Sequence, residues 1–457
     1  MAPYNTYQLS QVIATLALRL YDPTNQFWPQ SELTLYINEA LQTWNALTSF
    51  WRGDFTFQTA QNQTWYDLTA QANSLRPLTT TIPSLYPIIN THLLEPAATG
   101  PVSKQFSQTA YLNALLQCEN EMLSECGVYI TRTLVPAVSG RIVLADGTFD
   151  VIRIAYLPST SVIGGYGSGS FGLGPYGISG LTGTPENTVL WRDDAWAEQS
   201  FNPLYTLNPP GTPTVYLMSA QPPISFDVDT PPGFGGVYEV LTTNQALATG
   251  TQLMSIPNDW THVAKWGALA YLLAAESNAK DLPRAAYCAK RFVLGKQLLQ
   301  SAAALLAMRI DNVPLEVDAV TNGDQYDTRW QAHATNPPRR AYQAGLNLVA
   351  LAPAPWNPYS VTATVVQNAP LPSGPSDYVQ LSQDVLDVLI DYAQHLAAFK
   401  MGGAEFASTM PMLDRFMREA MVYNSKLSEM GEYTAFLLGL SNRNEAAAPR
   451  LDPEVLA

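Results

Sequence analysis

The sequence has few of the residues on which catalysis and metal binding depend. Only four of its 457 residues are histidine, and none has a second histidine at the i, i+4 spacing of a helical zinc site. We place His262 and His395 on helix surfaces or at an interface, and we interpret Asp193-Asp194 as a solvated turn. There is no G-x-S-x-G elbow, and Gly295-Lys296 lacks the upstream glycine of a phosphate-binding loop. We therefore expect a protein that is not an enzyme and that binds no cofactor or metal.

Charge is also scarce, at 14% of residues, and its balance is a formal −14. This balance argues against tight nucleic-acid binding, which needs lysine and arginine to neutralise phosphates. It does not argue against a surface past which DNA slides, because repulsion there prevents sticking. Few charges combined with many aromatics and prolines suit a chain packed against other chains. A secreted β-rich protein has a similar composition and is the alternative.

The sequence also contains few cysteines and no long apolar run. Cys118, Cys126 and Cys288 all fall on predicted helices, as expected of buried thiols in a reducing compartment. No window holds 18 apolar residues, and the segment 1–6 has neither a basic nor an apolar region. We expect no membrane span and no signal peptide.

Two helical hairpins organise what is present. Residues 257–309 predict two helices, with Asp281 capping the second and Pro283 in its first turn. Their apolar stripes recur at steps of three and four. The first stripe is Trp260, Val263, Ala264, Gly267, Tyr271 and Ala274, and the second is Cys288, Phe292, Gly295, Leu299, Ala302, Ala303 and Leu306.

The same plan recurs from Ser382 to Met430, with a break at Gly402-Gly403. Arg291-Phe292 and Arg415-Phe416 occupy matching places 124 residues apart. Upstream of each hairpin lie two short apolar segments around a proline-rich turn, which we interpret as β-hairpins: 224–228 with 237–240, and 348–351 with 359–362. The repetition predicts an internal duplication of a β-hairpin plus a helical hairpin.

The rest of the chain alternates between helical and β patterns. We expect helices at 9–20, 29–47 and 107–125, β-hairpins at 53–67 and around Asp146-Gly147, and loop-like stretches at 70–104 and 311–345. Residues 161–184 are rich in glycine. Gly167, Gly169 and Gly172 fit G-x-G-x-x-G, but the following Pro175 and Gly177 prevent the helix that dinucleotide binding requires. We interpret this segment as a loop shaped by a partner.

These patterns predict an α+β protein in six regions. They are a helical region with a small β-hairpin at 1–127, a β-rich domain at 128–255, a helical hairpin at 256–310, a second β-rich or irregular segment at 311–376, a second helical hairpin at 377–440, and a flexible tail at 441–457.

The first two helices carry a recognisable pattern. Leu20-Tyr-Asp-Pro-Thr-Asn-Gln-Phe-Trp28, then Ser31-Glu-Leu33 and Tyr36-Ile-Asn-Glu-Ala40, resembles the N-terminus of tailed-bacteriophage head-to-tail connector (adaptor) proteins. The resemblance covers residues 9–50. Pro29 stands where that family caps with serine or threonine, and this chain is several times longer than a minimal adaptor. Residues 211–228 and Tyr238 look like the β-rich, sandwich-like insertion of larger virion proteins with the same helices.

The resemblance implies a helical-bundle core and a homo-oligomeric ring, commonly of twelve subunits. Such a ring docks on the portal, lets double-stranded DNA pass through without specific binding, and offers a platform to tail or nozzle proteins in the virion neck. In the family a C-terminal extension often anchors on the portal. By this resemblance we expect Leu451, Val455 and Leu456 to bind a partner. Gly167, Gly169 and Gly172 of the glycine-rich segment are a second candidate contact. The alternatives are a tail-tube, fibre-attachment or decoration protein, for which more β structure is expected, and a tailspike, for which a β-helix repeat is expected.

Overall fold

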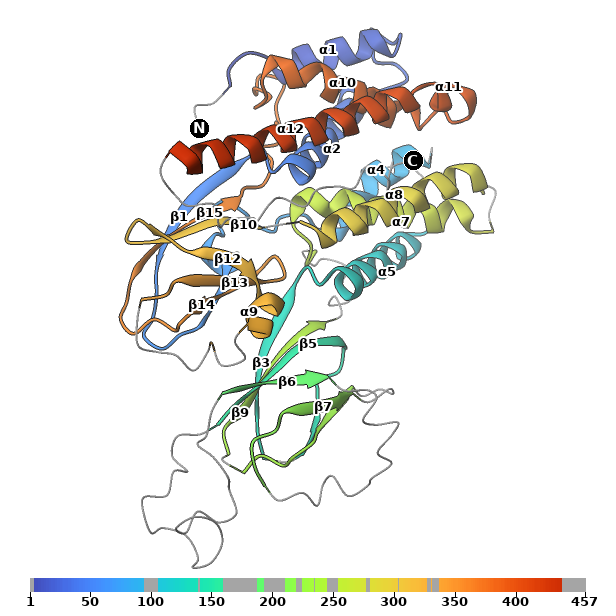
Figure 1. Cartoon of the computed structure of the whole chain (residues 1–457). Coiled ribbons are helices and arrows are strands. Elements are labelled where there is room, and N and C mark those ends of the chain that lie inside the picture. The colour runs from blue at the N-terminus through green and yellow to red at the C-terminus, as the bar shows by residue number, and fades with distance from the viewer. Residues whose placement is uncertain are drawn as a thin grey trace, which may run out of the picture.

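The computed structural model describes residues 4–93, 106–138, 140–158, 187–192, 210–218, 224–233, 235–244, 254–276, 280–302, 304–326, 330 and 337–437. Within these ranges the chain is a mixed α+β protein, as the sequence predicts. Figure 1 shows two groups of helices at one end, two small sheets beside them, and a larger sheet that projects away from the helices.

The first group of helices joins the two ends of the described chain. It contains α1 (Leu9–Arg19), α2 (Gln30–Thr48), α10 (Gln383–Ala398), α11 (Gly403–Ser408) and α12 (Met410–Leu437). Both predicted N-terminal helices are confirmed, and their apolar stripes are buried. Phe416 stacks on Tyr392 of α10 with ring centroids 4.2 Å apart and also contacts Trp44 of α2. The N-terminal helices therefore complete their core with helices that lie more than 300 residues later in the sequence.

The second group packs beside the first and shares one continuous apolar core with it. It contains η1 (Ile82–Leu85), α4 (Tyr86–His92), α5 (Gln108–Cys126), η4 (Asn258–Trp260), α7 (Thr261–Ala274) and α8 (Leu282–Gln300). The predicted cap of α8 is present, and α5 is capped at both ends. Ser107 accepts a hydrogen bond from the Ala110 amide, Asp281 accepts one from the Arg284 amide, and Gly127 ends α5 in the left-handed region. Cys118 and Cys288 are buried free thiols, and Cys126 is partly buried.

Glycine allows α7 and α8 to approach closely. A Cβ on Gly295 would lie 2.6 Å from Val263 Cγ1, and one on Gly267 would lie 2.9 Å from Phe292 Cδ2. The predicted seam is confirmed at these positions, but Tyr271 and Ala274, at the end of the first predicted stripe, are exposed.

Two four-stranded sheets lie beside the helices. One has the order β1 (Arg52–Gln58), β15 (Ser360–Val366), β10 (Leu305–Ile310) and β11 (Val313–Pro314). The other has the order β12 (Glu316–Ala319), β13 (Arg340–Ala344), β14 (Leu348–Ala352) and β2 (Trp65–Asp67). The short helices α3 (Leu68–Gln71) and α9 (Val320–Tyr326) follow β2 and β12.

The projecting sheet has seven strands in the order β3, β9, β5, β6, β7, β8, β4. Their bounds are β3 Ile130–Pro136, β4 Arg141–Val143, β5 Thr148–Leu157, β6 Thr188–Arg192, β7 Val215–Met218, β8 Ser225–Val228 and β9 Val237–Asn244. The outermost strands β3 and β4 are joined by only the four residues 137–140, so the sheet must fold back on itself. The face it encloses holds one apolar cluster around Phe226 and Tyr238.

All four predicted β-hairpins are wrong. β1 pairs with β15 whereas β2 pairs with β14, and β4 pairs with β8 whereas β5 pairs with β6 and β9. The two hairpins expected upstream of the helical pairs are also absent. β8 and β9 are not neighbours in the seven-stranded sheet, and β14 and β15 belong to different sheets. The turns are real, with positive φ at Asn62 and Gly147, but each carries the chain from one sheet, or one side of a sheet, to another.

Three helix or loop predictions also need correction. The second helix of the first hairpin ends at Gln300, and Leu305–Ile310 is strand β10, because this segment has a backbone partner in β15. The stretch 70–104 contains α4, and the stretch 311–345 contains strands β11 to β13 and α9. Short elements with weak periodicity obtain their stability from tertiary packing, which a local pattern does not report.

Candidate functional site

The residues to which the sequence analysis assigned partner binding lie outside the described residues. This applies to Gly167, Gly169 and Gly172 of the glycine-rich segment and to Leu451, Val455 and Leu456 of the tail. Asp193-Asp194 and His333 also lie outside them. Among the described residues, buried charged groups lie where the helices and the sheets meet.

The loop at residues 72–81 forms this junction. Asn258 holds it, since its side-chain amide donates to the Pro77 carbonyl (2.9 Å) and its Oδ1 accepts from the amides of Thr79 and Thr80 (3.1 Å each). Asn368, which follows β15, donates to the same Pro77 carbonyl from its side chain (2.8 Å). Polar side chains from η4 and from the strand end thus fix the loop that carries Arg76.

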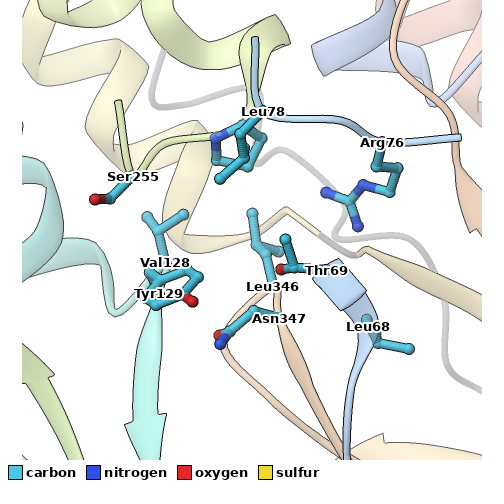
Figure 2. A pocket seen from close by; sticks show the side chains of 10 residues that line it. Leu68, Thr69, Arg76, Leu78, Val128, Tyr129, Ser255, Leu346 and Asn347 are labelled. Carbon is cyan, nitrogen blue, oxygen red and sulfur yellow. The ribbon is translucent and has the colours of Figure 1, made fainter. Parts of the chain in front are cut away.

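Arg76 lines two small hollows, one of which is drawn in Figure 2. The first is lined by Leu68, Thr69, Arg76, Leu78, Val128, Tyr129, Ser255, Pro257, Leu346 and Asn347, and its free volume is about 20 Å³. The second, of about 40 Å³, shares Arg76, Pro257 and Leu346 with the first and adds Asn45 and Asp259 among others. Spaces of this size hold one or a few water-sized groups and exclude a substrate of metabolite size.

The charges at this junction are incompletely matched. The Arg76 guanidinium has no hydrogen-bond or ion-pair partner within the part of the chain that the structure describes. Burial lowers its pKa to about 10, although the charge of Asp259 acts in the opposite direction. Asp259 is itself occupied, because it accepts from the side chain of Asn45 (2.6 Å) and from the Ala369 amide (3.2 Å). Burial raises the pKa of Asp259 to about 6.

A second buried polar group joins the projecting sheet to the smaller sheet that contains β2. Arg153 of β5 makes two hydrogen bonds to Asp324 of α9 (2.7 and 3.0 Å) and one to Glu239 of β9 (3.1 Å). Its guanidinium also lies near the rings of Trp65 and Trp330, whose indole nitrogens donate to Glu239 (2.9 Å) and Asp324 (2.8 Å). A planar cation held in this way fixes the two sheets against each other.

A third group crosses the helical core. Lys265 of α7 bonds to Glu39 of α2, to which the Trp266 indole also donates (3.1 Å). Lys265 Nζ also lies 3.4 Å from Nε2 of His92, the last residue of α4. Burial, and then the charge of Lys265, lowers the pKa of His92.

The surface positions expected for His262 and His395 are wrong, since both side chains are buried. His395 bonds to Tyr287 and Thr409, and burial lowers the pKa of each of these two histidines to about 3. His395 is thus a neutral histidine bonded on both ring nitrogens within the core, and this arrangement offers no open position for a reacting group.

The loop between α1 and α2 is an ordered surface feature. Asp22 accepts hydrogen bonds from the amides of Gln26, Phe27 and Trp28 at 2.8 to 3.0 Å. This cap leaves Tyr21 94% exposed and Phe27 48% exposed, while Trp28 is buried. Pro29 precedes α2 and provides no side-chain cap.

Among the described residues, no group of three or more histidine, cysteine, aspartate or glutamate side chains is placed to hold a metal ion. No helix there is long and apolar enough to cross a membrane.

The chain matches no protein-family model, and no curated protein is similar to it in sequence.

Proposed function

We propose that the chain is a structural virion protein, a head-to-tail adaptor that forms a ring on the portal and provides the platform for tail attachment. The observation that carries the proposal is the segment 9–50, whose sequence resembles the adaptor family. This segment forms two helices with buried inner faces and a loop fixed by Asp22 that leaves Tyr21 exposed. An ordered aromatic at a loop tip is suited to a contact with another chain.

Two further features are consistent with this role. The formal charge of −14 suits the wall of a channel through which DNA passes without binding. The buried groups around Arg153 and Lys265 connect elements that are distant in sequence, and such connections favour a body that transmits load without deforming.

We also propose that the internal duplication is limited to two pairs of helices, α7 with α8 and α10 with α12. Phe292 packs over Gly267 of α7, and Phe416 stacks on Tyr392 of α10, so each phenylalanine contacts the first helix of its own pair. The neighbouring arginines differ, since Arg415 bonds to Asp391 of its own pair whereas Arg291 bonds to Tyr392 of the other pair. Poor superposition of α7–α8 on α10–α12 in an experimental structure would show that there was no duplication.

The alternative is another neck or tail protein, such as one to which fibres attach. The observation that favours it is the projecting sheet, which stands away from the helices in Figure 1 and exposes Leu134, Val138 and Val143. The adaptor role accommodates the same sheet as an insertion.

Negative-stain electron microscopy of the purified full-length protein separates these roles. A ring with a central hole is expected for the adaptor, and a rod or a trimeric spike would reject it. A second experiment deletes residues 445–457. The isolated subunit should fold normally and no longer join portal-bearing heads, whereas normal tail attachment by the shortened protein would show that Leu451, Val455 and Leu456 are not anchors.

A further inference from the structure

We propose that the first hollow beside Arg76 is a binding site for a carboxylate group. The argument begins with the guanidinium, which is partly buried and has no partner among the described residues. Removing a cation from water without a counter-charge is costly, and an anion in contact with it recovers that cost. Among the described residues that line this hollow, none is acidic.

Two hydroxyl groups line the hollow together with the Arg76 guanidinium. Figure 2 shows Arg76 and Tyr129 reaching the hollow from opposite sides, with Thr69 between them. Within the described chain, neither the Thr69 hydroxyl nor the Tyr129 phenol has a hydrogen-bond partner, and both donate well to an anionic oxygen. The Asn347 side chain is already committed, because it exchanges two hydrogen bonds with the backbone of Ile130 (2.8 and 2.9 Å).

Size and wall chemistry select the class of anion. A free volume of about 20 Å³ admits a carboxylate group and excludes a nucleotide, so the rest of the ligand must lie outside the hollow. Apart from Ser255, the remaining wall is apolar, with Leu68, Leu78, Val128, Pro257 and Leu346, and it disfavours a hydrated inorganic ion. A carboxylate also matches the fork of a guanidinium with two parallel hydrogen bonds.

The carboxylate whose charge acts on Arg76, that of Asp259, is not this ligand. Asp259 lines the second hollow, where Asn45 and the Ala369 amide occupy its oxygens. Asp67 caps α3 by accepting from the Thr69 amide (2.8 Å). The ligand is therefore a free small acid or an acidic side chain from elsewhere. It would tie the Arg76 loop to the start of β3 and to the turn before β14, and would stiffen the junction of helices and sheets.

Thermal melting of the full-length protein tests the site. Sodium propionate is titrated at constant ionic strength, with sodium chloride making up the balance. The midpoint should rise with the logarithm of the propionate concentration once that exceeds the dissociation constant, and by about 1–2 °C at tenfold excess. Arg76→Gln should abolish the rise, and Thr69→Val and Tyr129→Phe should each weaken propionate binding several-fold. Arg418→Gln, which removes an exposed arginine of α12 paired with Asp414, is the matched control and should leave the rise unchanged.

A parallel titration with N-acetyl-glutamate N-methylamide distinguishes the sources. Binding of both compounds indicates a polypeptide side chain, and binding of propionate alone indicates a free acid. The proposal is wrong if propionate does not raise the midpoint, if chloride alone produces the same rise, or if Arg76→Gln responds like the unaltered protein. Should Arg76→Gln fail to fold, the Thr69→Val and Tyr129→Phe variants decide the question in the same way. A positive or negative result here leaves the adaptor proposal untouched, because microscopy tests that separately.

Discussion

The phenol of Tyr287 and Nε2 of His395 lie 2.7 Å apart, and this hydrogen bond joins α8 to α10. The neighbouring groups decide which of the two atoms donates this hydrogen bond. The Thr409 hydroxyl donates to the Phe406 carbonyl (2.7 Å), so it accepts from His395 Nδ1 (2.9 Å). Nδ1 therefore carries the proton of a neutral ring, and Nε2 accepts from Tyr287. A second proton on the ring would break this arrangement beside the cation of Arg291.

Acid should accordingly destabilise the protein through His395. Burial, and then the charge of Arg291, lowers the pKa of His395 from its ordinary 6.5 to about 3. Below pH 6.5 the unfolded chain takes up a proton that the folded chain does not, so stability falls as the pH falls from about 6.5 to about 3. The slope for one histidine is about 1.4 kcal/mol per pH unit. Urea unfolding of the unaltered protein and of His395→Gln, at pH 7.5 to 4.5, measures this difference; parallel curves would contradict it.

Alanine at Gly295 should destabilise the seam between α7 and α8. The added Cβ would lie 2.6 Å from Val263 Cγ1. Overpacking costs about 1–3 kcal/mol, and alanine returns about 1 kcal/mol of helix propensity, so a net loss of about 1 kcal/mol is expected. Val263→Ala on the same chain should recover part of the loss, and a double-mutant cycle from urea unfolding measures the coupling. Gly140→Ala is the control, since a Cβ there meets nothing within 4 Å.

Removal of the Arg153 cation should weaken the contact between the projecting sheet and its neighbour. Arg153→Met leaves the buried carboxylates of Glu239 and Asp324 without this partner, and the expected cost is about 3–5 kcal/mol in the free energy of unfolding. Arg340→Met breaks the exposed pair with Glu316 and should cost about 1 kcal/mol or less. Similar losses in the two variants would mean that the buried pair has no special role.

The glycine-rich segment 161–184 gives a prediction that rests on the sequence alone. Its glycines do not fix one backbone conformation unaided, so a contact with a neighbouring chain is expected to order them. Limited proteolysis should cleave the free subunit within this segment and spare the assembled protein. Equal protection in the two states would argue against a partner contact there.

The helices were predictable because their signals are local. Asp281 marks the start of a helix by its own side-chain geometry, and the structure places that start where the sequence indicated. The strands of the expected hairpins were found but not their partners, because a turn such as that at Asn62 is compatible with a hairpin and with a crossing between sheets. Only the distant partner, Val366 for Arg52, distinguishes the two.

The candidate site could not be predicted for a related reason. Arg76 is a single arginine in a stretch interpreted as a loop, and no spacing in the sequence indicates that its charge will lack a partner. That property arises only when η4, the end of β15 and the start of β3 meet around it. Likewise, the burial of His395 depends on Tyr287, which lies 108 residues away.

The pairing of β1 with β15 has a consequence for synthesis on the ribosome. Arg52 lies opposite Val366, so the first strand must wait for more than 300 further residues before its neighbour exists. At about 5–20 residues per second this delay is roughly 15–60 s. The strands of the projecting sheet, all between residues 130 and 244, find every partner within their own stretch. We expect this sheet to fold first on the nascent chain, while the apolar faces of α1 and α2 remain uncovered and depend on chaperones until α10 and α12 emerge.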